Sequence, residues 1–155
     1  MKKLLAMVLC VIFPAIALAG DNGYKIKYDG GSLSSYKPGE GMHLYIEGDH
    51  IRLMKGKQEV AVIPASAVTE ISYGQDVHRR VGAAIGIGVF TLGIGALMAL
   101  TKSKKHYIGI TWNEGGKRGG IAFQANKNDY RGLLMGLEGV TGKKAVDSDT
   151  MTVKN

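Results

Sequence analysis

Basic side chains stand on both sides of one apolar stretch in the middle of this chain. Lysine and arginine pair with phosphate and carboxylate groups, and near an anionic membrane each contributes about 1 kcal/mol of attraction. Because these cations adjoin an apolar segment, we expect them to contact anionic lipid headgroups; the alternative is that they are the ordinary basic flanks of any membrane segment. The residues given this role are Arg79, Arg80, Lys102, Lys104 and Lys105.

Histidines and serines form no catalytic or metal-binding set by their spacing. No two of His43, His50, His78 and His106 lie four residues apart, as two zinc ligands on one helix face would. His43 and His50 are expected to face each other across a hairpin, which leaves a weak surface metal site as an open alternative. No serine sits in a nucleophile elbow. We therefore expect no enzyme activity, no cofactor and no metal centre.

The apolar stretch, residues 81–100, holds five glycines and no charged residue. As one helix it would be about 30 Å long, enough to cross a hydrocarbon core. Its small residues recur three and four positions apart, which allows close helix packing in lipid and predicts self-association. The alternative is a core helix that never meets lipid. The residues expected to enter the membrane are Val81, Gly82, Ile85, Gly86, Gly88, Phe90, Leu92, Gly93, Gly95, Leu97 and Leu100.

The first nineteen residues are typical of a signal peptide. Lys2 and Lys3 precede an apolar run, and small residues at 17–19 predict cleavage before Gly20. Cys10 is the only cysteine and lies in that run, so the mature chain fits an oxidising compartment without disulfides. We expect an exported protein of the periplasm or cell envelope, associated with a membrane; an uncleaved N-terminal anchor is the alternative.

The chain carries a net charge of +7, or +5 without Lys2 and Lys3. A basic exported protein can bind anionic lipids, acidic glycans or nucleic acid. The lysines are scattered and no aromatic-rich basic motif accompanies them, so we expect no nucleic-acid partner. The expected partners are anionic membrane lipids, further copies of the chain and a protein that the sequence does not identify.

Alternating apolar and polar residues predict about seven short strands. They cover residues 24–29, 43–47, 50–54, 60–63, 66–73, 106–112 and 120–125. No helical crossover links two strands, so the sheet should be antiparallel. An apolar stripe from Tyr130 to Val140 then predicts one helix, which Gly142 ends. The fold class is mainly β with a C-terminal α-helix, in the form of a small barrel or two orthogonal sheets.

Four segments carry a family resemblance: residues 63–73, 105–112, 120–131 and 133–144. They resemble the strand and helix motifs of the pleckstrin-homology-like superfold in its bacterial and GRAM-like variants. The chain also resembles a group of exported bacterial proteins with the same apolar interruption. The resemblance covers about residues 24–142 and implies a small barrel of about seven antiparallel strands beside a C-terminal helix.

The resemblance does not carry a lipid activity with it. In this superfold, phosphoinositide binding depends on basic residues in the loop between the first two strands. Here that loop, residues 30–41, holds only Lys37. A shared fold alone does not establish an activity.

These patterns predict four parts: a signal peptide at 1–19, a pleckstrin-homology-like domain at 23–142, its insertion at 81–100 and a flexible tail at 143–155. If 81–100 crossed a membrane once, the strands on its two sides could not pair. We therefore expect an insertion that leaves and re-enters on one side, in a non-catalytic envelope binding or scaffold protein. The alternatives are a glycine-zipper oligomer that spans the membrane or forms a pore, and a protein that binds a small ligand or lipid.

Overall fold

The computed structural model describes residues 23–86 and 105–150. Within them, eight strands form one sheet with the order β4-β3-β2-β1-β7-β6-β5-β8. The mainly β class with a C-terminal helix is thus confirmed. All neighbouring strands are antiparallel except β8, which runs parallel to β5. The strands are β1 (Tyr24–Gly31), β2 (Gly41–Glu47), β3 (His50–Lys55), β4 (Gln58–Pro64), β5 (Val68–Tyr73), β6 (His106–Glu114), β7 (Lys117–Ala125) and β8 (Ala145–Asp147).

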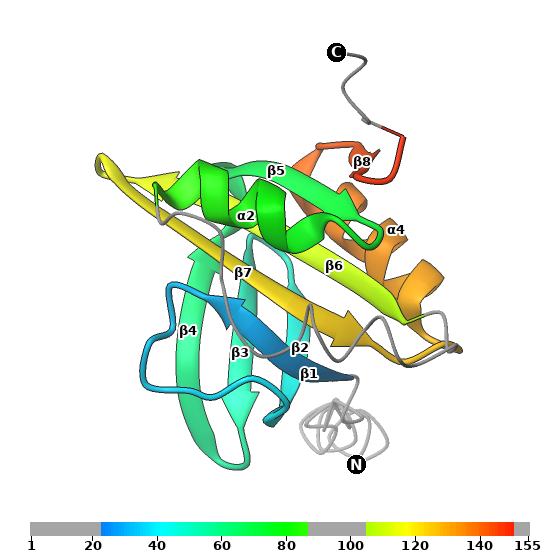
Figure 1. The fold of residues 1–155 in the computed structure, drawn as a ribbon. Coiled ribbons are helices and arrows are strands. Elements are labelled where there is room, and N and C mark those ends of the chain that lie inside the picture. Colours follow the sequence, from blue (N-terminus) through cyan, green and yellow to red (C-terminus); the bar gives the residue numbers. More distant parts are fainter. Residues whose placement is uncertain (1–22, 87–104, 151–155) are drawn as a thin grey trace, which may run out of the picture.

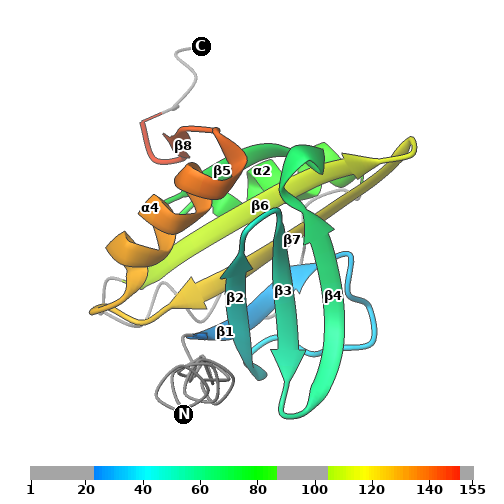
Figure 2. The same ribbon diagram turned by 180° about the vertical axis from the view of Figure 1, so that it is seen from behind.

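The sheet bends strongly, so that β2, β3 and β4 run across the direction of β5, β6 and β7, with β1 joining the two halves (Figures 1 and 2). Alternation places Ile26 and Tyr28 of β1 in the main core, and Ile121 and Phe123 of β7 join them there. Helix α4 (Tyr130–Thr141) adds Leu133 and Leu137 to this core. Gly142 ends the helix, as expected, with a left-handed φ of 68°.

The strands do not close into the small barrel that the sequence predicted. The sheet is open, because β4 and β8 stand at its two ends. After β4 the chain makes a 3-10 turn at Ala65–Ala67, and β5 then pairs with β6 instead of β4. The outer edge of β5 is taken by β8, from the segment expected to be a flexible tail, in the register Ile71 beside Ala145. The eighth strand is therefore parallel, in a sheet expected to be wholly antiparallel.

A second helix, α2 (Val77–Ile85), begins before the apolar stretch and continues into it. It lies on the face of β6 and β7 opposite to the one that faces the main core (Figure 1). A separate small core of Val77, Val81, Tyr107 and Ala122 lies between α2 and the sheet. The spacing of Val77, Val81 and Ile85 by four residues places all three on the helix face that packs there.

Candidate functional site

The strands on the two sides of the apolar stretch are neighbours in one sheet. Strand β5 ends before it and β6 begins after it, and they pair with Ile71 beside Ile110 and Tyr73 beside Ile108. Both attachments of the stretch therefore belong to one folded unit. In the described ranges 23–86 and 105–150, the helices are too short to span a membrane.

The first residues of the apolar stretch are part of the domain's own packing. Val81, on the face of α2 that packs on the sheet, is fully buried, and Gly109 and Gly120 on the strands below leave room for it. A Cβ built on Gly109 would lie 2.7 Å from methyl carbons of Val77 and Val81, closer than real contacts allow. Glycine at these sheet positions thus sets how closely α2 approaches.

The residues predicted to enter the membrane fall into two groups. Val81 and Gly82 are buried, Ile85 packs against the small core, and exposed Gly86 ends α2 with a left-handed φ of 72°. The remaining members lie outside the described residues: Gly88, Phe90, Leu92, Gly93, Gly95, Leu97 and Leu100.

The predicted headgroup cations do not form one cluster in the described residues. The side chain of Arg79 is 74% exposed, with its Nη1 3.9 Å from a carboxylate oxygen of Asp76. Arg80 instead donates two hydrogen bonds to the carboxylate of Glu70 on β5, at 2.9 and 2.8 Å. Lys105 lines a groove on the sheet, and Lys102 and Lys104 lie outside the described residues.

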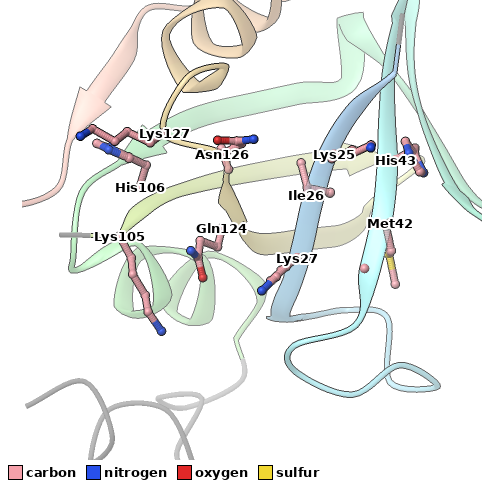
Figure 3. Close-up of a pocket in the computed structure, with 12 residues that line it drawn as sticks. Lys25, Ile26, Lys27, Met42, His43, Lys105, His106, Gln124, Asn126 and Lys127 are labelled. Carbon is pink, nitrogen blue, oxygen red and sulfur yellow. The ribbon is translucent and has the colours of Figure 1, made fainter. Parts of the chain in front are cut away.

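This groove, which we call the basic groove, has a volume of about 600 Å³ and is formed where β1 meets β2 and β7 (Figure 3). Its cations come from separate strands and their ends. Gln124 lies between Lys105 and Lys27 in the close-up, and Lys127 lies beside His106 (Figure 3). The cationic and ionisable lining residues are Lys25, Lys27, His43, Lys105, His106 and Lys127.

Sequence reasoning found Lys105 but missed Lys25, Lys27 and Lys127. The available signal was the alternation of β1, since Lys25 and Lys27 are exposed while Ile26 between them is buried. Only the pairing of β1 with β7, which sets Lys27 beside Gln124, brings them to the same surface as Lys105. That pairing joins residues about a hundred positions apart and leaves no local pattern.

Beside the groove, β1 carries a buried carboxylate that holds the start of α2. Oδ2 of Asp29 lies 2.5 Å from Nε2 of His78, in an ion contact whose angles are not those of an aligned hydrogen bond. Burial raises the pKa of Asp29, while His78 and Lys105 oppose that rise. The ring of His78 also meets Tyr107 edge to face at 5.0 Å, and burial with the Asp29 charge raises the pKa of Tyr107 to about 12.

The surface metal site left open at His43 and His50 is not formed. His43 is paired with Met54, and the two nitrogens of His50 contact Asp49 at 2.7 Å and Glu47 at 2.8 Å. Those carboxylates raise the pKa of His50, the hydrogen bond to Asp49 most of all. In the part of the chain that the structure describes, no three acidic, cysteine or histidine side chains are grouped to hold a metal.

Neither the models of known protein families nor the curated proteins give a match to this sequence.

The loop that leads into α2 is held by the C-terminal segment. Oδ1 of Asp149 accepts hydrogen bonds from the backbone N–H of Gln75 at 2.6 Å and of Asp76 at 3.3 Å. The N–H of Ser148 donates to the carbonyl of Tyr73 at 2.7 Å. The start of α2 therefore depends on β8 and the residues after it, as well as on the sheet beneath.

Proposed function

We propose that this is a non-catalytic, membrane-associated binding or scaffold protein of the cell envelope, exported by residues 1–19. Its folded domain stays on one side of the membrane, and the apolar stretch holds it there. The observation that carries the proposal is the pairing of β5 with β6, because it joins both attachments of the stretch to one sheet.

The position of α2 refines which residues do the anchoring. The side chain of Val81 is buried between α2 and the sheet, so it cannot be in lipid while the domain is folded as described. Membrane insertion is therefore assigned to the part of the stretch after Gly86, residues 87–100. Ile85 lies over Gly120, whereas His106 pairs with Ala125, five residues further along β7. The two attachments are thus about 17 Å apart along that strand.

We also propose a pleckstrin-homology-like ancestry for the domain. It is supported by two sheet portions that cross, with β1 shared between them, and by a C-terminal helix that contributes to their core. The open edge at β4 and the added strand β8 depart from the expected barrel. Since Lys37 is the only basic residue of the loop at 30–41, no phosphoinositide activity is proposed for that loop.

A deletion tests the anchoring. Residues 87–100 are replaced by a Gly/Ser linker of about eight residues, long enough to span about 17 Å with slack. We expect this variant to unfold cooperatively. It should not co-float with membrane vesicles in a density gradient, whereas the full chain should. The matched control deletes 81–100, which also removes Val81 and Ile85 from the small core. That control should be clearly less stable. A shorter deletion that still floats with membranes, or that does not fold, would contradict the proposal.

Accessibility labelling separates insertion from spanning. Single cysteines replace the exposed Arg79 before the stretch and the exposed Lys117 after it, with Cys10 changed to serine. An impermeant thiol reagent should reach both from the same side of the membrane. Labelling from opposite sides would instead support the glycine-zipper spanning assembly.

A further inference from the structure

We propose that the basic groove is a binding site for a phosphate monoester group. This goes beyond membrane anchoring, and it holds whether or not residues 87–100 enter a lipid bilayer. The site is built by side chains of β1, β2, β7 and the start of β6 (Figure 3).

The first argument for a phosphate site is the positive charge of the groove. Lys25, Lys27, Lys105 and Lys127 all line it, and its lining residues in the described ranges include no carboxylate. Two lysines elsewhere on the domain have a carboxylate partner, since Lys55 contacts Glu40 and Lys144 contacts Glu138. The nearest acid along β1 is Asp29, which does not line the groove; its carboxylate contacts His78 and also interacts electrostatically with Lys105. The groove therefore has a surplus of positive charge that an anion would balance.

The second argument is the arrangement of hydrogen-bond donors around the groove. The lysines reach the groove from three separate places in the sequence, so their ammonium groups can approach a bound group from different directions. Gln124 and Asn126 add side-chain amide donors on the same lining. A phosphate monoester offers about −1.5 to −2 charges at neutral pH and three acceptor oxygens, so it can accept hydrogen bonds from several such donors at once. A carboxylate has one charge and two oxygens, and it would leave part of the lysine charge unbalanced.

The third argument is the size and position of the groove. A volume of about 600 Å³ falls in the range of small-ligand sites and exceeds what a single inorganic ion fills. Lys105, which lines the groove, is the first described residue after the apolar stretch. The phosphate can thus belong to a soluble ester or to a lipid headgroup, and the experiment distinguishes these sources.

The test uses the full chain in a neutral detergent and follows backbone amide chemical shifts during titration with glycerol 3-phosphate, with glycerol as the uncharged reference. The groove variant is Lys25→Gln with Lys27→Gln. The control variant is Lys37→Gln with Lys57→Gln, which removes the same charge from exposed lysines outside the groove. We expect shifts in β1 and in β7 near Gln124. Affinity should fall about tenfold in the groove variant, as loss of two charge-assisted contacts implies, and less than about twofold in the control.

A second arm measures binding to vesicles of phosphatidylcholine alone and of phosphatidylcholine mixed with phosphatidic acid, whose headgroup is a phosphate monoester. A groove-dependent preference for the anionic vesicles supports the proposal with a lipid source, and a groove-dependent response to glycerol 3-phosphate alone supports it with a soluble source. Equal weakening of the two variants would overturn it, since net charge alone would then explain binding. Absence of a groove-dependent response in both arms would also overturn it. Binding to neutral vesicles reports on membrane anchoring separately.

Discussion

Arg80 and Glu70 form a two-point ion pair that joins helix α2 to strand β5. Nε and Nη2 of the guanidinium donate to the two carboxylate oxygens at 2.9 and 2.8 Å. The pair stands at the edge of the helix whose apolar face packs on β6 and β7, and it fixes the rotation of that helix on the sheet. A residue expected to contact lipid headgroups is thus engaged within the domain.

Replacing Arg80 by Gln should destabilise the protein by about 1 kcal/mol, because a bidentate pair is stronger than a single surface contact but both side chains remain partly exposed. Chemical denaturation would measure the change, and a double-mutant cycle with Glu70→Gln would isolate the pair. Arg79→Gln, at a largely exposed side chain, serves as the control and should leave stability unchanged. A coupling near zero in the cycle would show that the pair does not hold α2.

Gly109→Ala should loosen α2 from the sheet. The added methyl would meet Val77, Val81 and the Ser72 hydroxyl at 2.7 Å, and overpacking of this kind costs about 1–3 kcal/mol. Hydrogen exchange of the α2 amides should rise together with the loss of stability. Gly48→Ala has open space around it and provides the matched control. Unchanged exchange in α2 would mean that the close approach is not needed.

The contribution of Asp29 to the free energy of unfolding should change with pH in the direction opposite to that of a carboxylate whose pKa is lowered by folding. Its pKa in the folded state is raised above 3.8, chiefly by burial, so the folded chain binds this proton more tightly than the unfolded chain does. As pH rises from 3.8 through the raised pKa, the Asp29 contribution to stability falls. The unfolding free energy of Asp29→Asn relative to the native sequence should therefore increase over that interval.

Glu40 supplies the comparison for that experiment. Its pKa is lowered, mainly by the hydrogen bond from Lys55. Its favourable contribution is present above the ordinary value of 4.5 and is lost as pH falls. Glu40→Gln should therefore lose stability relative to the native sequence as pH rises. The same pH trend for both variants would contradict the assignment of Asp29 as a buried, proton-retaining group.

Asp149→Ala should release the loop before α2. The backbone N–H groups of Gln75 and Asp76 would lose their acceptor, and their hydrogen exchange should accelerate several-fold. Glu114→Ala removes an exposed carboxylate at the distant turn between β6 and β7 and is the control. Equal exchange at Gln75 in both variants would show that Asp149 does not support the helix start.

Local patterns predicted most of the elements. Alternation in β1 placed Ile26 and Tyr28 inside, and the turn at Gly48 and Asp49 between β2 and β3 was found from its turn residues. Helix α4 followed from its apolar stripe. These features were predictable because periodicity and turn chemistry depend on neighbouring residues.

What the sequence did not reveal depends on contacts between distant residues. Val81 carries the same hydrophobic signal whether it meets lipid or the glycines of β6 and β7. The short strand β8 has three residues, too few for an alternation pattern, and it exists through its pairing with β5. The basic groove likewise depends on the register that puts Lys27 beside Gln124.

The hydrogen bonds from Gln75 and Asp76 to Asp149 can form only after residue 149 has been synthesised. Synthesis runs from the N-terminus, so α2 and the apolar stretch after it are made well before the residue that secures the helix start. Until residue 149 has emerged, the loop before α2 lacks these two bonds and β5 lacks its partner β8. The apolar stretch is therefore synthesised while the helix before it still lacks part of its support, which strand β8 and Asp149 later complete.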